Sequence, residues 1–148
     1  MNNERILIVE DEKIIALDLQ RRLERFGFSV VGMAASGDEA VSLAKDREPD
    51  IILMDIRLEG EMDGIEASKR IRSQFAIPVI FLTAYTDEKT LERAKEVEPF
   101  GYILKPFKER ELYTTIDIAL YKNSIDKKLR KQELLFSAML HSINDGII

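Results

Sequence analysis

The sequence predicts an α/β protein built on a doubly wound, five-stranded parallel sheet with helices on both faces. Short apolar runs of strand length alternate with longer segments in which apolar residues recur at helical spacing. Strands separated by helices imply parallel pairing through right-handed crossovers. The middle runs are apolar almost throughout, as expected when both faces of a strand are covered. A length of 148 residues suits one such domain and is too short for two ordinary ones.

The elements follow in chain order. After the first apolar run, RILIVE, residues such as Ile15 and Leu19 mark one helical face, and Gly27 is a helix stop. Pro49 leads into the third strand, and Pro99 closes the fourth helix. The predicted strands are residues 5–10, 28–34, 50–55, 77–83 and 101–104. The predicted helices are residues 12–26, 38–47, 63 to about 75, 87–98, and a long last helix from near 107.

The composition, 45% hydrophobic and 33% charged, is ordinary for a soluble globular protein. A net charge of −5 argues against nucleic acid as the main partner, and we interpret the basic stretch 122–133 as a solvated helix face. The absence of cysteine excludes disulfides and thiolate chemistry. The longest apolar run, 77–82, is far too short to span a membrane, and no signal peptide precedes the first strand. We therefore expect a cytoplasmic protein.

Polar side chains follow four of the five predicted strands. Glu10 and Asp11 come after the first strand, Asp55 ends the third, Thr83 ends the fourth, and Lys105 follows the fifth. In such sheets ligands bind beyond the carboxyl ends of the strands. In the flavodoxin-like order 2-1-3-4-5 the first and third strands are neighbours, so Asp11 and Asp55 converge, together with Glu10.

Converging carboxylates repel one another unless a cation compensates them. Oxygen ligands with room for water suit Mg²⁺, or Mn²⁺ in its place. Lys105 would add a positive charge and Thr83 a hydroxyl donor. Such a set can transfer a phosphoryl group, because a carboxylate attacks in line while the metal and the lysine neutralise the phosphoryl oxygens.

Each of these residues also has a purely structural explanation. A strand-terminal Asp commonly caps a helix or forms a turn, a Thr there bonds the backbone, and a Lys lies along the surface. Their occurrence together at one edge of one sheet favours the functional interpretation.

The residues around these positions resemble the receiver domains of bacterial and archaeal response regulators over about residues 4–122. The resemblance implies that Asp55 accepts a phosphoryl group from the phosphohistidine of a sensor histidine kinase or a phosphotransfer protein. The motifs that carry it are Ile8-Val9-Glu10-Asp11, Leu53-Met54-Asp55-Ile56, Asp63-Gly64, Leu82-Thr83-Ala84 and Tyr102-Ile103-Leu104-Lys105-Pro106-Phe107.

The resemblance also assigns a metal site. It implies that Asp11 and Asp55 ligate Mg²⁺ directly, that Glu10 binds it through water, and that the main-chain carbonyl of Arg57 supplies another oxygen. Arg57 and Tyr85 occupy two positions that tune the lifetime of the phosphoaspartate in the family, and their bulk predicts slow self-dephosphorylation. The loop after Asp55 departs from the family: it lacks the usual proline at Glu59 and carries one extra residue, which alters loop stiffness and partner docking.

A conformational switch follows from the same resemblance. Thr83 and Tyr102 would be the switch pair, changing the surface of the fourth helix and fifth strand, and Lys105 would be the phosphate-binding base. A small residue, Ala84, leaves room for the phosphoryl group, and a cis peptide bond is expected at Lys105-Pro106. Without the resemblance, Tyr102 would be interpreted as an amphipathic aromatic residue at a sheet edge.

The chain continues beyond the expected receiver domain, residues 1–122, as a helical linker, residues 123–148. A 4/3 spacing with six apolar positions out of eight predicts packing on a partner helix, most simply in a parallel homodimer; the alternative is a helix that folds back on its own domain. Residues 135–148 look like the opening of a PAS sensory domain, so we expect the N-terminal part of a longer signalling protein. The eight positions are Ile118, Lys122, Ile125, Leu129, Gln132, Phe136, Met139 and Ile143.

Three other functions fit the sequence less well. A haloacid-dehalogenase-type phosphohydrolase would have Asp-x-Asp after the first strand, where this chain has Glu10-Asp11-Glu12, and Asp55-Ile56-Arg57 also lacks a second Asp. A nucleotide or flavin binder would carry a glycine-rich or Walker loop, which does not follow the first strand. A receiver-like scaffold that is never phosphorylated would not need all the groups for phosphoryl transfer, and this chain has all of them. We therefore expect a signalling module, not an enzyme with a separate substrate.

Overall fold

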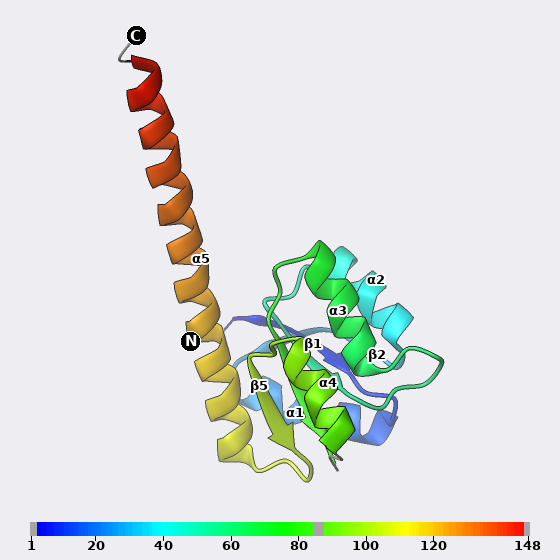
Figure 1. The fold of residues 1–148 in the computed structure, drawn as a ribbon. Coiled ribbons are helices and arrows are strands. Elements are labelled where there is room, and N and C mark those ends of the chain that lie inside the picture. The colour runs from blue at the N-terminus through cyan, green and yellow to red at the C-terminus, as the bar shows by residue number, and fades with distance from the viewer. Residues whose placement is uncertain (1–2, 85–87, 147–148) are drawn as a thin grey trace.

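The computed structural model describes the backbone of residues 3–84 and 88–146, and the side chains of all of these except Arg130 and residues 141–146. Over this part of the chain five strands alternate with five helices (Figure 1). The strands are β1 (Arg5–Val9), β2 (Ser29–Ala34), β3 (Ile51–Asp55), β4 (Val79–Thr83) and β5 (Gly101–Leu104). The helices are α1 (Lys13–Arg25), α2 (Gly37–Arg47), α3 (Gly64–Gln74), α4 (Glu88–Glu96) and α5 (Glu109–Gly146).

The five strands form one parallel sheet in the order β2-β1-β3-β4-β5, which confirms the predicted topology. Val9 of β1 is level with Met54 of β3, and Asp55 is level with Leu82 of β4. Thr83 is in turn level with Leu104 of β5. The residues that follow β1, β3, β4 and β5 therefore emerge side by side at one edge of the sheet.

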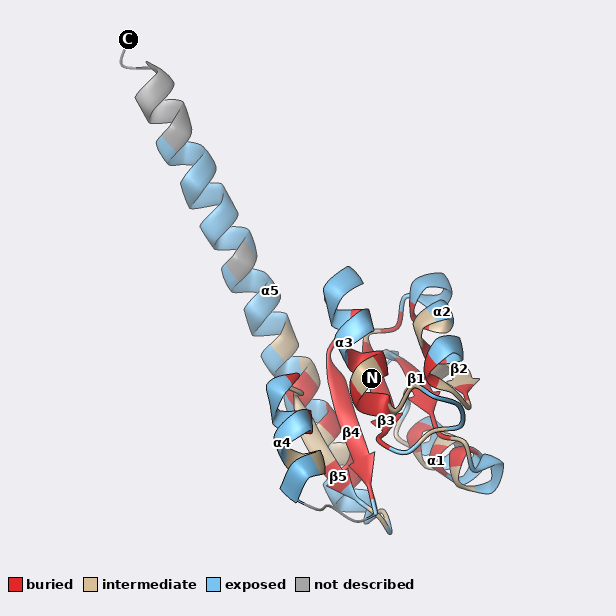
Figure 2. Cartoon of the chain, turned by 45° about the vertical axis from the view of Figure 1, so that its right-hand side comes forward, coloured by how far each residue is buried: buried red, intermediate tan, exposed pale blue. Residues whose placement is uncertain are grey.

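Each face of the sheet has its own hydrophobic core, because alternate residues of a strand point to opposite faces. Leu7 and Phe81 belong to the core under α2, α3 and α4, while Ile8 and Leu82 belong to the core under α1 and α5. The central strands are consequently buried along their whole length (Figure 2). This double burial explains why their sequences are apolar without a polar alternation.

Local signals set most helix boundaries close to their predicted places. Gly27, with a φ of 94°, follows α1, and the side chains of Ser36 and Asp63 cap α2 and α3 by accepting backbone N–H bonds. β4 begins at Val79 and not at Ile77. Proline has no N–H to donate, so Pro78 contributes only its carbonyl, which accepts from the N–H of Ile52 at 3.0 Å.

Helix α5 is one continuous helix of 38 residues that leaves the domain (Figures 1 and 2). Its first turns are buried against the sheet through Leu112, Ile116 and Ala119. Beyond them the helix projects away, with apolar side chains such as Leu129 and Phe136 exposed. The alternative in which this helix folds back on its own domain is therefore not what the structure shows. None of the described helices has the length and apolar character that a bilayer crossing requires.

Candidate functional site

Three carboxylates meet beyond the ends of β1 and β3. Glu10, Asp11 and Asp55 each offer an oxygen, and these oxygens all lie within 4.8 Å of one another. Glu10 and Asp55 are buried, and Asp11 is half-buried. The adjacency of β1 and β3 in the sheet produces this cluster, as the strand-end argument predicts.

Lys105 joins the cluster from the far side of β4. Its Nζ lies 2.5 Å from Oε1 of Glu10 and 2.9 Å from Oδ2 of Asp55. The N–H of Lys105 donates to the carbonyl of Thr83 at 2.9 Å, which fixes the start of this segment to the end of β4. The peptide bond between Lys105 and Pro106 is cis, as expected. One ammonium group thus bridges two of the three carboxylates.

The electrostatics of the cluster favour an added cation. The pKa of the Glu10 carboxyl is raised to about 8, first by burial and then by hydrogen bonding to Asp55, against an opposing effect of Lys105. Burial lowers the pKa of Lys105, but its hydrogen bonds to Glu10 and Asp55 outweigh this, so the net shift is upward. The Glu10 carboxyl therefore binds a proton more readily than a free carboxyl does, as expected of a buried acidic group beside a second carboxylate.

A divalent metal ion fits this donor set. Carboxylate oxygens are hard ligands of the kind that Mg²⁺ and Mn²⁺ prefer, and the neighbouring cavity of about 460 Å³ has room for coordinated water. A metal ion would displace the proton from Glu10 and neutralise the repulsion between the carboxylates. The acidic triad is therefore a suitable site for the ion.

The remaining predicted residues are placed as follows. Thr83 is buried at the end of β4 and lines the same cavity as Asp55 and Lys105. Arg57 also lines the cavity, and its N–H donates to Oδ1 of Asp55 at 3.3 Å. Tyr102 is half-buried on β5 and packs its ring beside Phe81, with 6.2 Å between the ring centroids, and it does not line the cavity. Tyr85 lies outside the described residues.

Two features of the site escape prediction from the sequence. The Asp63-Gly64 pair signals a helix start, but not that Gly64 presses against the backbone of Asp55: a Cβ atom on Gly64 would lie 2.0 Å from the Asp55 carbonyl oxygen. Arg93 of α4 lines the cavity and pairs with Asp63 at 2.9 Å. An arginine on a polar helix carries no sequence signal that distinguishes it from an ordinary surface residue.

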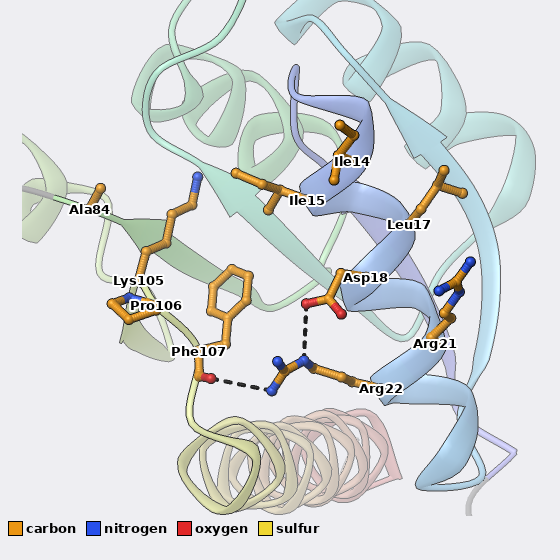
Figure 3. Close-up of a pocket in the computed structure, with 10 residues that line it drawn as sticks. All are labelled: Ile14, Ile15, Leu17, Asp18, Arg21, Arg22, Ala84, Lys105, Pro106 and Phe107. Atoms are coloured by element: carbon orange, nitrogen blue, oxygen red, sulfur yellow. Dashed lines mark hydrogen bonds and ion pairs between the residues drawn. The ribbon is translucent and has the colours of Figure 1, made fainter.

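A second, largely apolar hollow of about 820 Å³ adjoins the acidic cavity (Figure 3). Residues of α1 form one wall, and Lys105, Pro106 and Phe107 form the facing wall. Arg22 ties the two walls together by donating to the carbonyl of Phe107 at 3.3 Å. Lys105 and Ala84 line both cavities, so the hollow and the acidic cavity share a wall at these residues.

Comparisons with known proteins agree with this geometry. A family model described as the response regulator receiver domain matches residues 6–117. The chain is 38% identical over 116 residues to the transcriptional regulatory protein PdtaR of Mycobacterium tuberculosis, covering 78% of this chain and 56% of that one. It is 34% identical over 145 residues to YdfI of Bacillus subtilis, a transcriptional regulatory protein, covering 95% and 68%. The chain thus spans little more than half of PdtaR.

Two solved structures share the fold. The signal receiver domain of a modulated diguanylate cyclase from Desulfovibrio desulfuricans G20 has a TM-score of 0.80 and 40% identity, covering 84% of this chain and 98% of that one. The N-terminal domain of a response regulator/sensory box/GGDEF 3-domain protein from Carboxydothermus hydrogenoformans has a TM-score of 0.77 and 35% identity, covering 83% and 98%.

Proposed function

The chain belongs to the response regulator receiver domain family, and on this premise we propose that it is a phosphorylation switch in which Asp55 is the phosphoacceptor. The observation that carries the proposal is the Lys105 ammonium bridging Asp55 and Glu10 within the acidic triad. This arrangement places a nucleophilic carboxylate, a fixed positive charge and a set of metal ligands in one cavity. The phosphoryl donor is the phosphohistidine of a histidine kinase or of a phosphotransfer protein.

The transfer is an in-line displacement. An oxygen of the Asp55 carboxylate forms a bond to phosphorus as the bond from phosphorus to the histidine nitrogen breaks, and that nitrogen keeps the bonding electron pair. Lys105 neutralises one phosphoryl oxygen, and the Thr83 hydroxyl donates to another. The metal ion, held by Glu10, Asp11, Asp55 and the Arg57 carbonyl, supplies further positive charge to the phosphoryl group when bound.

Phosphorylation then changes the surface near α4 and β5. The phosphoryl group adds roughly two negative charges, which draws the Thr83 hydroxyl inward. Tyr102, already packed beside Phe81, turns into the space that Thr83 leaves. Arg57 and Tyr85 shield the acyl phosphate from water, so its hydrolysis is slow.

The donor docks in the apolar hollow next to the site. Ile14 and Leu17 on α1 are exposed, by 84% and 37%, and both line this hollow. Exposed apolar side chains that border a functional site mark a binding surface. A helix of the donor seated there would bring its phosphohistidine to the shared wall at Lys105, within reach of Asp55.

The projecting part of α5 pairs with α5 of a second copy. The apolar positions at 4/3 spacing are exposed in one chain, Leu129 by 52%, Phe136 by 64% and Met139 by 61%, and a parallel coiled coil would bury them. In that register Lys128 at a g position faces Glu133 at the e position of the second copy, an attractive pair. The dimer would carry the change at β5 and α5 along the helix.

The helix leads toward a sensory domain. Residues 135–148 look like the start of a PAS domain, and the neighbour from Carboxydothermus hydrogenoformans is the N-terminal domain of a protein that also holds a sensory box. The receiver, residues 1–122, and the linker, residues 123–148, therefore form the input end of a longer signalling chain in the cytoplasm.

Phosphorylation by a small phosphodonor tests the proposal. With acetyl phosphate and Mg²⁺ the protein should gain one acid-stable, alkali-labile phosphoryl group, and Asp55→Asn should abolish the gain. Asp46→Asn, which changes an exposed carboxylate on α2, is the matched control and should behave like the parent protein. An equal gain of phosphate by Asp55→Asn would refute the assignment, and continuous release of phosphate from many esters would indicate a phosphohydrolase.

A further inference from the structure

Arg93 on α4 lies at the rim of the acidic cavity, where it pairs with a residue outside the acidic triad. Its Nη1 lies 2.9 Å from Oδ2 of Asp63. The side chain also lines the same cavity as Asp55 and Lys105. Nearly half of it, 46%, is exposed, so water screens the ion pair and the pair is weak.

The partner of Arg93 directly precedes the residue that packs against the backbone of Asp55. Asp63 is the N-cap of α3, and its Oδ1 accepts from the N–H of Glu66 at 2.9 Å. The next residue, Gly64, lies so close to Asp55 that a Cβ there would be 2.0 Å from the Asp55 carbonyl oxygen. Arg93 is therefore bound to the carboxylate of Asp63, and the residue after Asp63 contacts the phosphoacceptor.

Helix α4 buries little of its own surface. Ala94 is the one buried residue among its nine, and its outer surface is exposed (Figure 2). Elements with few buried apolar contacts move at a low free-energy cost. A change in the group that Arg93 binds can therefore shift α4 relative to the cavity.

We propose that Arg93 reads the phosphorylation state: its guanidinium leaves Asp63 and binds the phosphoryl group on Asp55, which draws α4 toward the cavity. This inference rests on the proposed function of Asp55. Asp63 offers one negative charge, whereas the phosphoryl group adds roughly two, with three strong acceptor oxygens. A guanidinium binds phosphate through two parallel hydrogen bonds, which a lysine cannot do.

The positive charge of Lys105 at the site is already engaged, so binding of the phosphoryl group by Arg93 is not redundant. Lys105 already divides its ammonium between Glu10 and Asp55, at 2.5 and 2.9 Å. A phosphoryl group on Asp55 adds three strong acceptor oxygens, more than the Lys105 ammonium or a metal ion can bind alone. Arg93 is the other cationic side chain, besides Arg57, among the described residues that line this cavity, and it comes from α4. Exchange of its partner thus converts a charge change at Asp55 into a displacement of α4.

A double-mutant cycle tests the exchange. Asp63→Asn keeps the helix cap, because asparagine caps as well as aspartate, but it frees Arg93. Arg93→Ala should slow phosphorylation by acetyl phosphate about fivefold, Asp63→Asn should speed it about threefold, and the double variant should match Arg93→Ala. Arg93→Lys should restore only part of the rate, and Lys95→Ala, which removes an exposed charge from the same helix, should leave it unchanged.

Amide hydrogen exchange in α4 distinguishes this proposal from a purely structural role of Arg93. A structural role would not make the exchange depend on phosphorylation. Phosphorylation should change the protection of α4 amides in the parent protein and in Lys95→Ala, and the change should disappear in Arg93→Ala. If Arg93→Ala is phosphorylated at the parent rate, or if Asp63→Asn acts equally with and without Arg93, the inference is overturned while Asp55 remains the acceptor. If the parent protein gains no phosphate at Asp55, the proposed function itself fails.

Discussion

Replacing Gly64 with alanine should destabilise the protein, although helix propensity alone predicts the opposite. Gly64 is the first residue of α3, where alanine is ordinarily favoured over glycine by up to about 1 kcal/mol. Here the added Cβ would lie 2.0 Å from the Asp55 carbonyl oxygen, and ordinary contact begins at 3.4 Å. The two backbone segments must therefore separate by about 1.4 Å, the difference between these distances. Overpacking that moves backbone costs about 3 kcal/mol.

Urea unfolding followed by circular dichroism measures this effect. The free energy of unfolding of Gly64→Ala should fall by about 3 kcal/mol, and phosphorylation should slow because Asp55 is displaced. Gly37→Ala is the matched control: Gly37 is also buried and begins α2, but its added Cβ would meet the side chain of Met62, Sδ at 2.8 Å, Cγ at 2.9 Å and Cβ at 3.0 Å, which can turn away as a backbone carbonyl cannot. The control should change stability by less than about 1 kcal/mol. Equal or greater stability of Gly64→Ala would show that Gly64 does not pack this closely against the Asp55 carbonyl.

Four further predictions concern the metal site, the donor and the second copy. Because the pKa of Glu10 is raised to about 8, its proton competes with the metal, so Mg²⁺ affinity measured by calorimetry should fall about fivefold from pH 8 to pH 7; a constant affinity would contradict this. The same raised pKa means that metal-free stability in urea should decrease as pH rises from about 4.5 to 8, since only the folded chain binds this proton there. Ile14→Asp should slow phosphotransfer from a histidine kinase about tenfold and leave acetyl phosphate labelling unchanged; equal slowing of both would exclude docking at α1. Phe136→Glu should convert the dimer to a monomer in sedimentation equilibrium, and a parent chain that is monomeric at about 100 μM would disprove the pairing.

The sheet could be predicted because its signals are local. The apolar runs, the helical spacing and residues such as Gly27 each act within a few positions of the chain, and the parallel order follows from general rules of connection. The course of α5 could not be predicted in this way. The exposed seam that contains Phe136 has the same pattern whether the helix packs on its own domain or projects from it, and only the structure shows that it projects.

Some contacts of the site could likewise be predicted from local signals, and others could not. Asp55 and Lys105 could be predicted to meet, since each ends or follows a strand whose place in the sheet was itself predictable. The contact of Gly64 with Asp55 depends on the path of a loop, which the sequence does not determine. The pairing of Arg93 with Asp63 joins residues thirty positions apart on two helices, where ordinary polar surface residues look identical in sequence.

The assignment of Asp55 as the phosphoacceptor is tested most directly by locating the phosphoryl group on the chain. The protein is incubated with acetyl phosphate and Mg²⁺, the acyl phosphate is reduced with borohydride, and the peptides are sequenced by mass spectrometry. If Asp55 is the phosphoacceptor, a single reduced carboxyl is found, at Asp55, and it disappears when EDTA replaces Mg²⁺. Reduction at Asp11 or at any other carboxyl, or labelling that persists without a divalent ion, would contradict this assignment.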